Sequence, residues 1–249
     1  MTTLLPDRID ARRTRLVVDA AAGRPRVRSE TSGDPRRPCL RPMIIASRSE
    51  YVKVCLVPDG ALLLAGDTIQ LEVTLGPGVR LDLIEAAGTV AYDMRGGQAV
   101  WDVSLQLAER ATLVWAGEPF VLAGGARVLR STDVDLGSGA RLAVRETLVL
   151  GRHQERSGVL TQTWTATSTD GQELLREDLD LDESAHRPGV LGGNRVLGSV
   201  VALGFELPAE VCPQGRMDLE KGGTVWRRLA ADAHRGVPDE AWRAVLDAC

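Results

Sequence analysis

Several residue types are scarce in this 249-residue chain, and each shortage excludes a class of protein. Aromatic residues make up only 4% of the chain, so aliphatic side chains must fill the core, and an aromatic-lined sugar groove is not expected. The chain has only two lysines, Lys53 and Lys221. Neither ends a glycine-rich loop with the Gly-Lys-Ser/Thr sequence that binds phosphates, which excludes a P-loop nucleotide site.

Long hydrophobic runs are also missing. No stretch approaches the roughly 18 consecutive apolar residues of a membrane span, and arginines interrupt the amino-terminal region where a signal peptide would need its apolar core. We therefore expect a cytoplasmic protein without membrane association. The four cysteines, Cys39, Cys55, Cys212 and Cys249, show no Cys-x-x-Cys spacing, and in a reducing compartment they are expected to be free thiols.

Metal-binding and catalytic motifs are absent as well. The three histidines are far apart and form no His-Glu-x-x-His motif, and there is no Gly-x-Ser-x-Gly nucleophile elbow. Asp178, Asp180 and Asp182 resemble the start of a calcium loop, but Glu183 stands where that loop requires glycine. The alternation instead predicts a strand with Leu179 and Leu181 on the core face and the carboxylates outward. No dedicated metal site, catalytic residue or tightly bound cofactor is predicted.

The charge of −4 is unevenly distributed. Residues 1–48 hold eleven arginines and five acidic residues, whereas residues 170–183 hold seven acidic residues and one arginine. An arginine-rich segment can attract nucleic acid, but this one lacks the interleaved aromatic residues on which bases stack. We therefore interpret it as a solvated surface and expect no nucleic-acid partner.

Period-2 alternation of apolar and polar residues dominates the chain and predicts a mainly β protein. In residues 68–75, Ile69, Leu71, Val73 and Leu75 alternate with polar residues, and the pattern restarts after Gly76-Pro77-Gly78. Gly137-Ser138-Gly139 is interpreted as a hairpin turn. No fixed repeat of 20–50 residues is evident, so the pattern favours a large antiparallel β-sandwich or a β-helix-like body. Strands are predicted at 13–18, 24–28, 51–57, 68–75, 79–84, 99–107, 111–115, 126–136, 141–150, 159–169 and 173–181, with a loop at 31–42.

The carboxyl-terminal third differs in pattern. The apolar stretch 196–207 fits either a helix or a buried strand. Val225, Leu229 and Ala233 recur at helical spacing, which predicts a helix over 224–233, and Pro238 begins a second helix with Trp242, Val245 and Leu246 on one face. The domain prediction is thus a flexible arm at 1–12 and a single β domain at 13–249, with a helical segment at about 224–247.

Four segments, in order, resemble the UreD (UreH) family of urease accessory proteins. Residues 59–91 are similar to the family's Gly-Leu-Leu-Gly-Gly-Asp strand and the turn after it, and residues 115–127, WAGEPFVLAGGAR, to its tryptophan-containing segment. Residues 133–152, DVDLGSGARLAVRETLVLGR, are the closest match, and residues 174–181 resemble another family strand. Together they cover about residues 13–246. The chain departs from the family pattern at Leu64-Ala65, at Val90 and over residues 31–50.

This resemblance implies a non-enzymatic maturation factor. Such proteins bind apo-urease together with UreF and the GTPase UreG, and they help to deliver nickel to the urease active site. Because free Ni²⁺ is bound tightly by many protein groups, its transfer is expected to need a shielded route with weak, transient binding at each step. Glu85, Glu118, Glu146 and Asp178, which lie at strand ends or in the family-like segments, are the candidate groups for this route.

An alternative function stays open from the sequence. A β-sandwich or β-solenoid can carry a carbohydrate-active lyase or hydrolase that works with paired carboxylates. Such an enzyme would line a groove with aromatic residues, which are scarce here.

Overall fold

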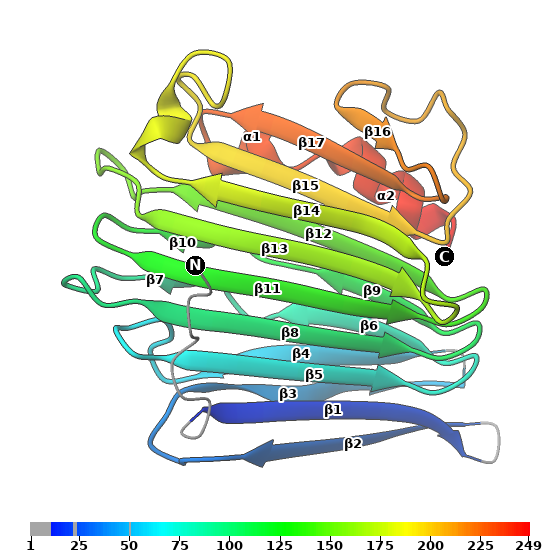
Figure 1. Cartoon of the computed structure of the whole chain (residues 1–249). Helices are drawn as coiled ribbons and strands as arrows, with labels where there is room; N and C mark the ends of the chain where they lie inside the picture. The colour runs from blue at the N-terminus through cyan, green and yellow to red at the C-terminus, as the bar shows by residue number, and fades with distance from the viewer. Residues whose placement is uncertain (1–10, 22–23, 50) are drawn as a thin grey trace.

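Two large β-sheets lie face to face and enclose the core (Figure 1). The structure is a computed structural model that describes residues 11–21, 24–49 and 51–249. Most of the predicted arm at 1–12 therefore lies outside the described residues, although Arg12 begins the first strand. No helix in the described ranges has the length and apolar character needed to cross a membrane.

One sheet has seven strands, in the order β14-β13-β11-β8-β5-β1-β2. Its strands are β1 (Arg12–Ala21), β2 (Arg24–Ser32), β5 (Thr68–Leu75), β8 (Ala99–Leu107), β11 (Arg127–Leu136), β13 (Val159–Ser168) and β14 (Glu173–Leu181). The ten-stranded sheet has the order β16-β17-β15-β12-β9-β6-β4-β3; in addition, β10 pairs with β12, and β7 pairs with β10. Its strands are β3 (Cys39–Ser47), β4 (Val52–Asp59), β6 (Arg80–Glu85), β7 (Thr89–Ala91), β9 (Thr112–Ala116), β10 (Phe120–Leu122), β12 (Arg141–Leu150), β15 (Val196–Leu203), β16 (Arg216–Asp218) and β17 (Thr224–Ala230).

The chain crosses repeatedly from one sheet to the other and so forms a β-solenoid. Its four coils are β4–β5, β6–β8, β9–β11 and β12–β13, and successive coils pair in parallel within each sheet. The prediction of a mainly β protein with a β-helix-like body is therefore confirmed. Antiparallel pairing occurs at the two ends of the body, where β1–β2, β3–β4, β13–β14, β12–β15 and β15–β17 pair in this way.

A four-residue turn connects the two sheets at the same end of each coil. The turns are residues 76–79 (GPGV), 108–111 (AERA) and 137–140 (GSGA), and each follows a buried leucine: Leu75, Leu107 or Leu136. The third residue of each turn has a positive φ: 66° at Gly78, 56° at Arg110 and 64° at Gly139. Backbone hydrogen bonds also join each turn to the next, because Gly78 N–H donates to the Glu109 carbonyl and Arg110 N–H to the Ser138 carbonyl, both at 2.9 Å.

These turns correct two predictions. Gly137-Ser138-Gly139 does not close a hairpin, because the strands on either side of this turn, β11 and β12, belong to different sheets. The chain also has a repeat that was not recognised, since hydrogen-bonded partners on neighbouring coils are separated by 29 residues (Asp102 and Ser131) or by 32 (Arg130 and Gln162). The period of the repeat alternates between these two values. The feature that the three coil junctions share in sequence is a leucine followed by a four-residue turn.

Most predicted strands are confirmed, and four of them (68–75, 99–107, 141–150 and 173–181) have the predicted bounds. Residues 196–203 form the buried strand β15 rather than a helix. The strand β3 falls partly in the predicted loop at 31–42 and was not predicted, and β7, β10 and β16 are short strands that were also missed. On β3, the outer strand of its sheet, Met43, Ile44 and Ile45 are more than half exposed.

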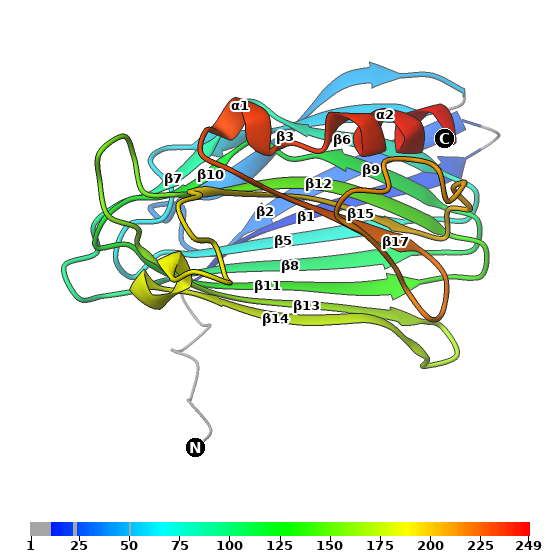
Figure 2. The ribbon, with the colours of Figure 1, turned by 90° about the horizontal axis from the view of Figure 1, so that it is seen from above.

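The helix predicted over 224–233 is wrong, since residues 224–230 form β17. Trp226 faces away from the interior and packs against the last helix, while Arg227 points to the other side, so the segment follows period 2. Two short helices end the chain, α1 (Ala233–Gly236) and α2 (Asp239–Asp247), and α2 begins after Pro238 as predicted. Both helices cover the outer face of the ten-stranded sheet (Figure 2), where Trp242 and Val245 pack on Val114 and Val200.

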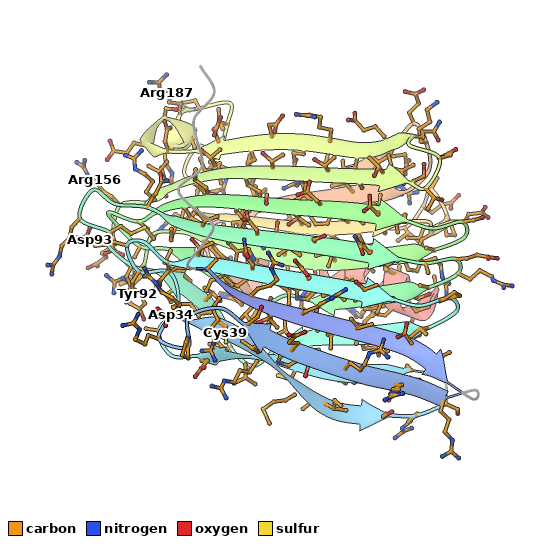
Figure 3. All side chains as sticks on the ribbon, turned by 60° about the horizontal axis from the view of Figure 1, so that its bottom comes forward. Asp34, Cys39, Tyr92, Asp93, Arg156 and Arg187 are labelled. Atoms are coloured by element: carbon orange, nitrogen blue, oxygen red, sulfur yellow. The ribbon has the colours of Figure 1, made fainter. Side chains whose placement is uncertain are left out.

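The long connections lie at the end of the solenoid opposite the four-residue turns. Figure 3 shows Tyr92, Asp93, Arg156 and Arg187 together at this end. The short strands β7 and β10 pair in parallel there, and β10 also pairs with β12, so they extend the ten-stranded sheet toward this end.

The positive φ at the turns leads to a stability prediction. A Cβ at Gly78 meets no atom within 4 Å, so a substitution there tests backbone strain alone. We expect Gly78→Val to lower the free energy of unfolding by about 1–2 kcal/mol, because a β-branched residue resists the left-handed region. Urea denaturation measures this change. Arg110→Gly is the control and should cause no comparable loss; equal stability of Gly78→Val and wild type would contradict the argument.

Candidate functional site

Four charged or amide side chains lie between the sheets, in an interior that is mostly apolar. They are Glu85 from β6, Arg130 from β11, Glu146 from β12 and Gln162 from β13, and we call them the interior polar cluster. Glu85, Arg130 and Glu146 line a small cavity together with Trp101, Trp115, Phe120 and Trp164. Gln162 contacts Arg130 and Glu146. Three successive coils of the chain are needed to bring these four residues together, with Glu146 and Gln162 both on the last one.

The register of the solenoid explains how the cluster forms. In the seven-stranded sheet, Trp101, Arg130 and Gln162 pair with one another on three successive coils. In the ten-stranded sheet, Ile84 pairs with Ala116 and Ala116 with Arg145, so the residues that follow them, Glu85, Gly117 and Glu146, come at the same level. Gly117 is required in the middle, since a Cβ there would lie 2.6 Å from the carbonyl oxygen of Arg145.

Arg130 and Glu146 form an ion pair across the interior. Arg130 Nη1 lies 2.6 Å from Glu146 Oε1, and the two side chains are only 9% and 12% exposed. Gln162 bonds to both partners: its Oε1 accepts from Arg130 Nη1 at 3.1 Å, and its Nε2 donates to Glu146 Oε2 at 3.2 Å. The Gln162 amide is therefore hydrogen-bonded to both charged side chains of the ion pair.

The rest of the Arg130 guanidinium faces aromatic rings. Its Cζ lies 5.0 Å from the ring centroid of Phe120 and 6.0 Å from that of Trp101, within the range of cation–π attraction. Arg130 Nε and Trp101 Nε1 are buried, and neither has a hydrogen-bond partner among the described residues. The ion pair is therefore made through one nitrogen and is not the two-pronged contact that arginine and carboxylate form at their strongest.

Glu85 is held at the other side of the cavity by two N–H groups. Its Oε1 accepts from Trp115 Nε1 at 3.1 Å, and its Oε2 accepts from the backbone N–H of Glu118 at 3.0 Å. Burial raises the pKa of Glu85 to about 7, although both hydrogen bonds and the charge of Arg130 act in the opposite direction. At neutral pH this carboxyl group is about half ionised.

On the side of the ten-stranded sheet, the cluster approaches the surface through Glu118. The Glu118 side chain is 42% exposed, and its Oε1 lies 3.6 Å from Arg145 Nη2. Arg145 in turn lies 5.6 Å from the ring of Trp242 on α2 and donates to the Gly117 carbonyl at 3.2 Å. Glu118 thus stands at the boundary between Glu85 and solvent.

On the other side of the cluster, further polar residues lie between Glu146 and the ion pair that joins β17 to β14. Glu146 pairs in register with the buried Ser199, whose hydroxyl accepts from Arg227 Nη1 at 2.8 Å. Arg227 also forms an ion pair with Glu177 of β14. Polar side chains therefore follow one another across the interior from Glu118 to Glu177, and strand register, not a hydrogen bond, places Ser199 beside Glu146.

The structure brings together three of the four candidate residues named from the sequence. Glu85, Glu118 and Glu146 all line the one cavity. Asp178 lies apart, on the outer face of the seven-stranded sheet, where its side chain is 61% exposed and accepts a hydrogen bond from Thr163. As predicted for this strand, Leu181 is buried and the aspartates face outward.

Sequence reasoning missed Arg130 and Gln162. Both occupy positions of a period-2 strand that would otherwise face the core: Arg130 follows the buried Val128, and Gln162 lies between the buried Leu160 and Trp164. An arginine at an apolar position of a strand was the available signal. This signal was missed because the ion-pair partner of Arg130, Glu146, lies on another coil and is not linked to it by any local sequence pattern.

The cavity itself is small, with a volume of about 20 Å³. This is room for about one water molecule and far too little for a sugar ring. Wider hollows, of about 530 and 460 Å³, lie at the surface at the turn end and at the loop end. Among the described residues, no group of three or more His, Cys, Asp or Glu side chains is arranged to hold a metal ion. All four cysteines are unpaired.

Comparison with known proteins identifies the family. The family model described as "UreD urease accessory protein" matches residues 12–244, nearly the whole chain. The chain belongs to the UreD family. It is 45% identical over 215 residues to urease accessory protein UreD 1 of Streptomyces griseus subsp. griseus, with 84% of each chain covered. It is also 34% identical over 239 residues to urease accessory protein UreD of Frankia casuarinae, covering 91% of this chain and 74% of the relative.

Family membership confirms the resemblance described above. UreD accessory proteins are non-enzymatic factors involved in urease maturation, so the carbohydrate-active enzyme considered from the sequence is wrong. The size of the cavity agrees with this outcome, because its carboxylates cannot reach a sugar substrate.

The raised pKa of Glu85 predicts a pH dependence of stability. Below its ordinary pKa of 4.5 the group is protonated in both the folded and unfolded states. As pH rises toward 7 the unfolded chain ionises first, so the free energy of unfolding should fall by about 3 kcal/mol between pH 4.5 and 7 and then level off. Thermal denaturation across this pH range should show the fall in wild type and in Glu118→Gln, but not in Glu85→Gln. A Glu85→Gln profile parallel to wild type would contradict the assignment.

The buried ion pair predicts strong coupling between two substitutions. Arg130→Met should destabilise the protein by about 3–5 kcal/mol because it leaves the carboxylate of Glu146 buried without its partner. The double variant Arg130→Met/Glu146→Met should recover most of this loss, since two apolar side chains then pack in place of the pair. Urea denaturation of the two single variants and the double variant measures the coupling. Additive losses would show that the pair does not interact in solution.

Proposed function

We propose that this UreD-family chain is a scaffold and metallochaperone of urease maturation in the cytoplasm. In this role it binds apo-urease together with UreF and UreG, and it helps to deliver Ni²⁺ to the urease active site. Nickel is the cargo, and the chain holds it only transiently. The observation that carries the proposal is the line of polar side chains that follow one another across the mostly apolar interior from Glu118 to Glu177.

A shielded interior suits the transfer of nickel for a physical reason. Ni²⁺ binds strongly to imidazole, thiolate and carboxylate groups, and an exposed ion would be captured by competing ligands. The line offers carboxylates singly and not as a closed cage, since Glu85 and Glu146 come from different coils and no group of three is arranged for metal. Single carboxylates bind a divalent cation weakly, so the ion is able to leave each one.

Charge balance limits what the cluster can hold at rest. Arg130 neutralises Glu146, and the raised pKa of Glu85 keeps this carboxyl group partly protonated. An interior with so little net negative charge does not trap a divalent cation. Transfer therefore requires the cluster to change when cargo is present, which favours a chain that acts within a complex and not alone.

The partners of the complex follow partly from family membership and partly from this proposal. Family membership places the chain with the urease maturation machinery. UreF, UreG and apo-urease are the specific partners proposed, and the absence of a phosphate-binding lysine motif in this sequence leaves GTP hydrolysis to UreG.

Urease activation tests the interior route. We expect Glu85→Gln to lower nickel-dependent urease activation several-fold, about tenfold if one carboxylate contributes about 1.4 kcal/mol to the transfer step. Asp178→Asn, on the outer face, should activate urease like wild type. Both variants are co-expressed with UreF and UreG from the same source, and size-exclusion chromatography must show the same complex for each.

The outcomes separate the parts of the proposal. Normal activation by Glu85→Gln would remove the interior route, and a loss confined to Asp178→Asn would move the route to the outer face. A folded wild-type chain that elutes alone at every concentration, without UreF and UreG, would overturn the proposed complex.

A further inference from the structure

We propose that Glu146 and Gln162 form a divalent-cation site that the guanidinium of Arg130 fills in the resting protein, and that Ni²⁺ occupies it only after Arg130 has moved away. This inference rests on the proposed function, since it takes nickel as the cargo. In this inference, the positive charge of Arg130 occupies the place that a metal ion would take.

The position of Arg130 Nη1 is the first argument. This nitrogen lies 2.6 Å from a carboxylate oxygen of Glu146 and 3.1 Å from the amide oxygen of Gln162. Carboxylate and amide oxygens are common protein ligands of divalent cations that bind oxygen and nitrogen donors. The positive charge of the arginine is thus placed between two oxygen ligands, as a metal ion would be.

The second argument is that Arg130 is held on one side only. All the polar contacts described for its guanidinium are made by Nη1, while Nε is buried without a hydrogen-bond partner among the described residues. The remaining contacts are with the faces of Phe120 and Trp101. A guanidinium bound through one nitrogen and stacked on rings loses few directed hydrogen bonds when it moves, unlike one held by a two-pronged contact.

The third argument comes from space and unsatisfied donors. The cavity beside the pair has a volume of about 20 Å³, enough for about one water molecule and not for a hydrated cation. Trp101, which is 2% exposed, is one of the residues that line the cavity, and its buried indole N–H has no hydrogen-bond partner among the described residues. This donor calls for an oxygen in the cavity, and withdrawal of Arg130 makes room for a cation that brings water with it.

Nickel binding to the isolated chain tests the inference without urease. Isothermal titration with NiCl₂ should show that Arg130→Met gains one site that wild type lacks, at least about tenfold tighter than any wild-type binding to surface groups. The gain should disappear in Arg130→Met/Glu146→Gln. Arg145→Met is the matched control: it removes another half-buried arginine that contacts a carboxylate and an aromatic ring, and it should gain no site.

Stability gives a second readout of the same site. Addition of NiCl₂ should raise the Tm of Arg130→Met more than that of wild type, because a ligand that binds only the folded state stabilises it. MgCl₂ at the same concentration controls for a general effect of divalent charge. Should Arg130→Met fail to fold, Arg130→Gln keeps a donor toward Glu146 and undergoes the same two measurements.

Two results would overturn the inference. One is a folded Arg130 variant whose nickel isotherm equals that of wild type. The other is a wild-type site that Glu146→Gln abolishes, since nickel would then bind with Arg130 in place. Failure of the proposed function looks different: Arg130→Met would gain its site while Glu85→Gln still activates urease normally, which would leave a real cation site that lies off the delivery route.

Discussion

The stacking of the four coils in register is the constraint on which the rest of the structure depends. Each coil pairs its backbone with the next in both sheets, so one shift of register would turn every inward side chain outward. The turns after Leu75, Leu107 and Leu136 fix this register, because all three have four residues with a positive φ at the third. Variation in coil length is confined to the opposite end.

Stacking also explains why polar groups can exist in the interior at all. Arg130, Glu146 and Gln162 come from three strands that no local sequence pattern links, yet the register aligns them so that each satisfies the others. A buried charge without a partner is strongly destabilising, and a pair of charges contributes little net stability compared with apolar packing. The ion pair between Arg130 and Glu146 is therefore not explained by its contribution to stability, and the proposed function gives it a role.

The sequence predicted the strands well and their partners poorly. Alternation over residues 68–75 or 141–150 defines a strand from local information, but whether a glycine turn closes a hairpin or crosses to another sheet depends on distant strands. Residues 224–230 were mistaken for a helix because Val225 and Leu229 also fit helical spacing, and only pairing with β15 decides the matter. At the site, Glu85, Glu118 and Glu146 were named because they lie at strand ends or in the family-like segments, whereas Arg130 required knowledge of which coil it faces.

The exposed strand β3 has a consequence for the isolated chain. It ends the ten-stranded sheet with one edge unpaired in the described structure, and Met43, Ile44 and Ile45 lie on it in succession, each more than half exposed. Water solvates such an edge poorly, and strands of other molecules add to it readily. Association of the free chain through this edge is therefore expected to increase with protein concentration. A polar residue in place of Ile44 is the simplest change that would keep the protein monomeric in dilute buffer.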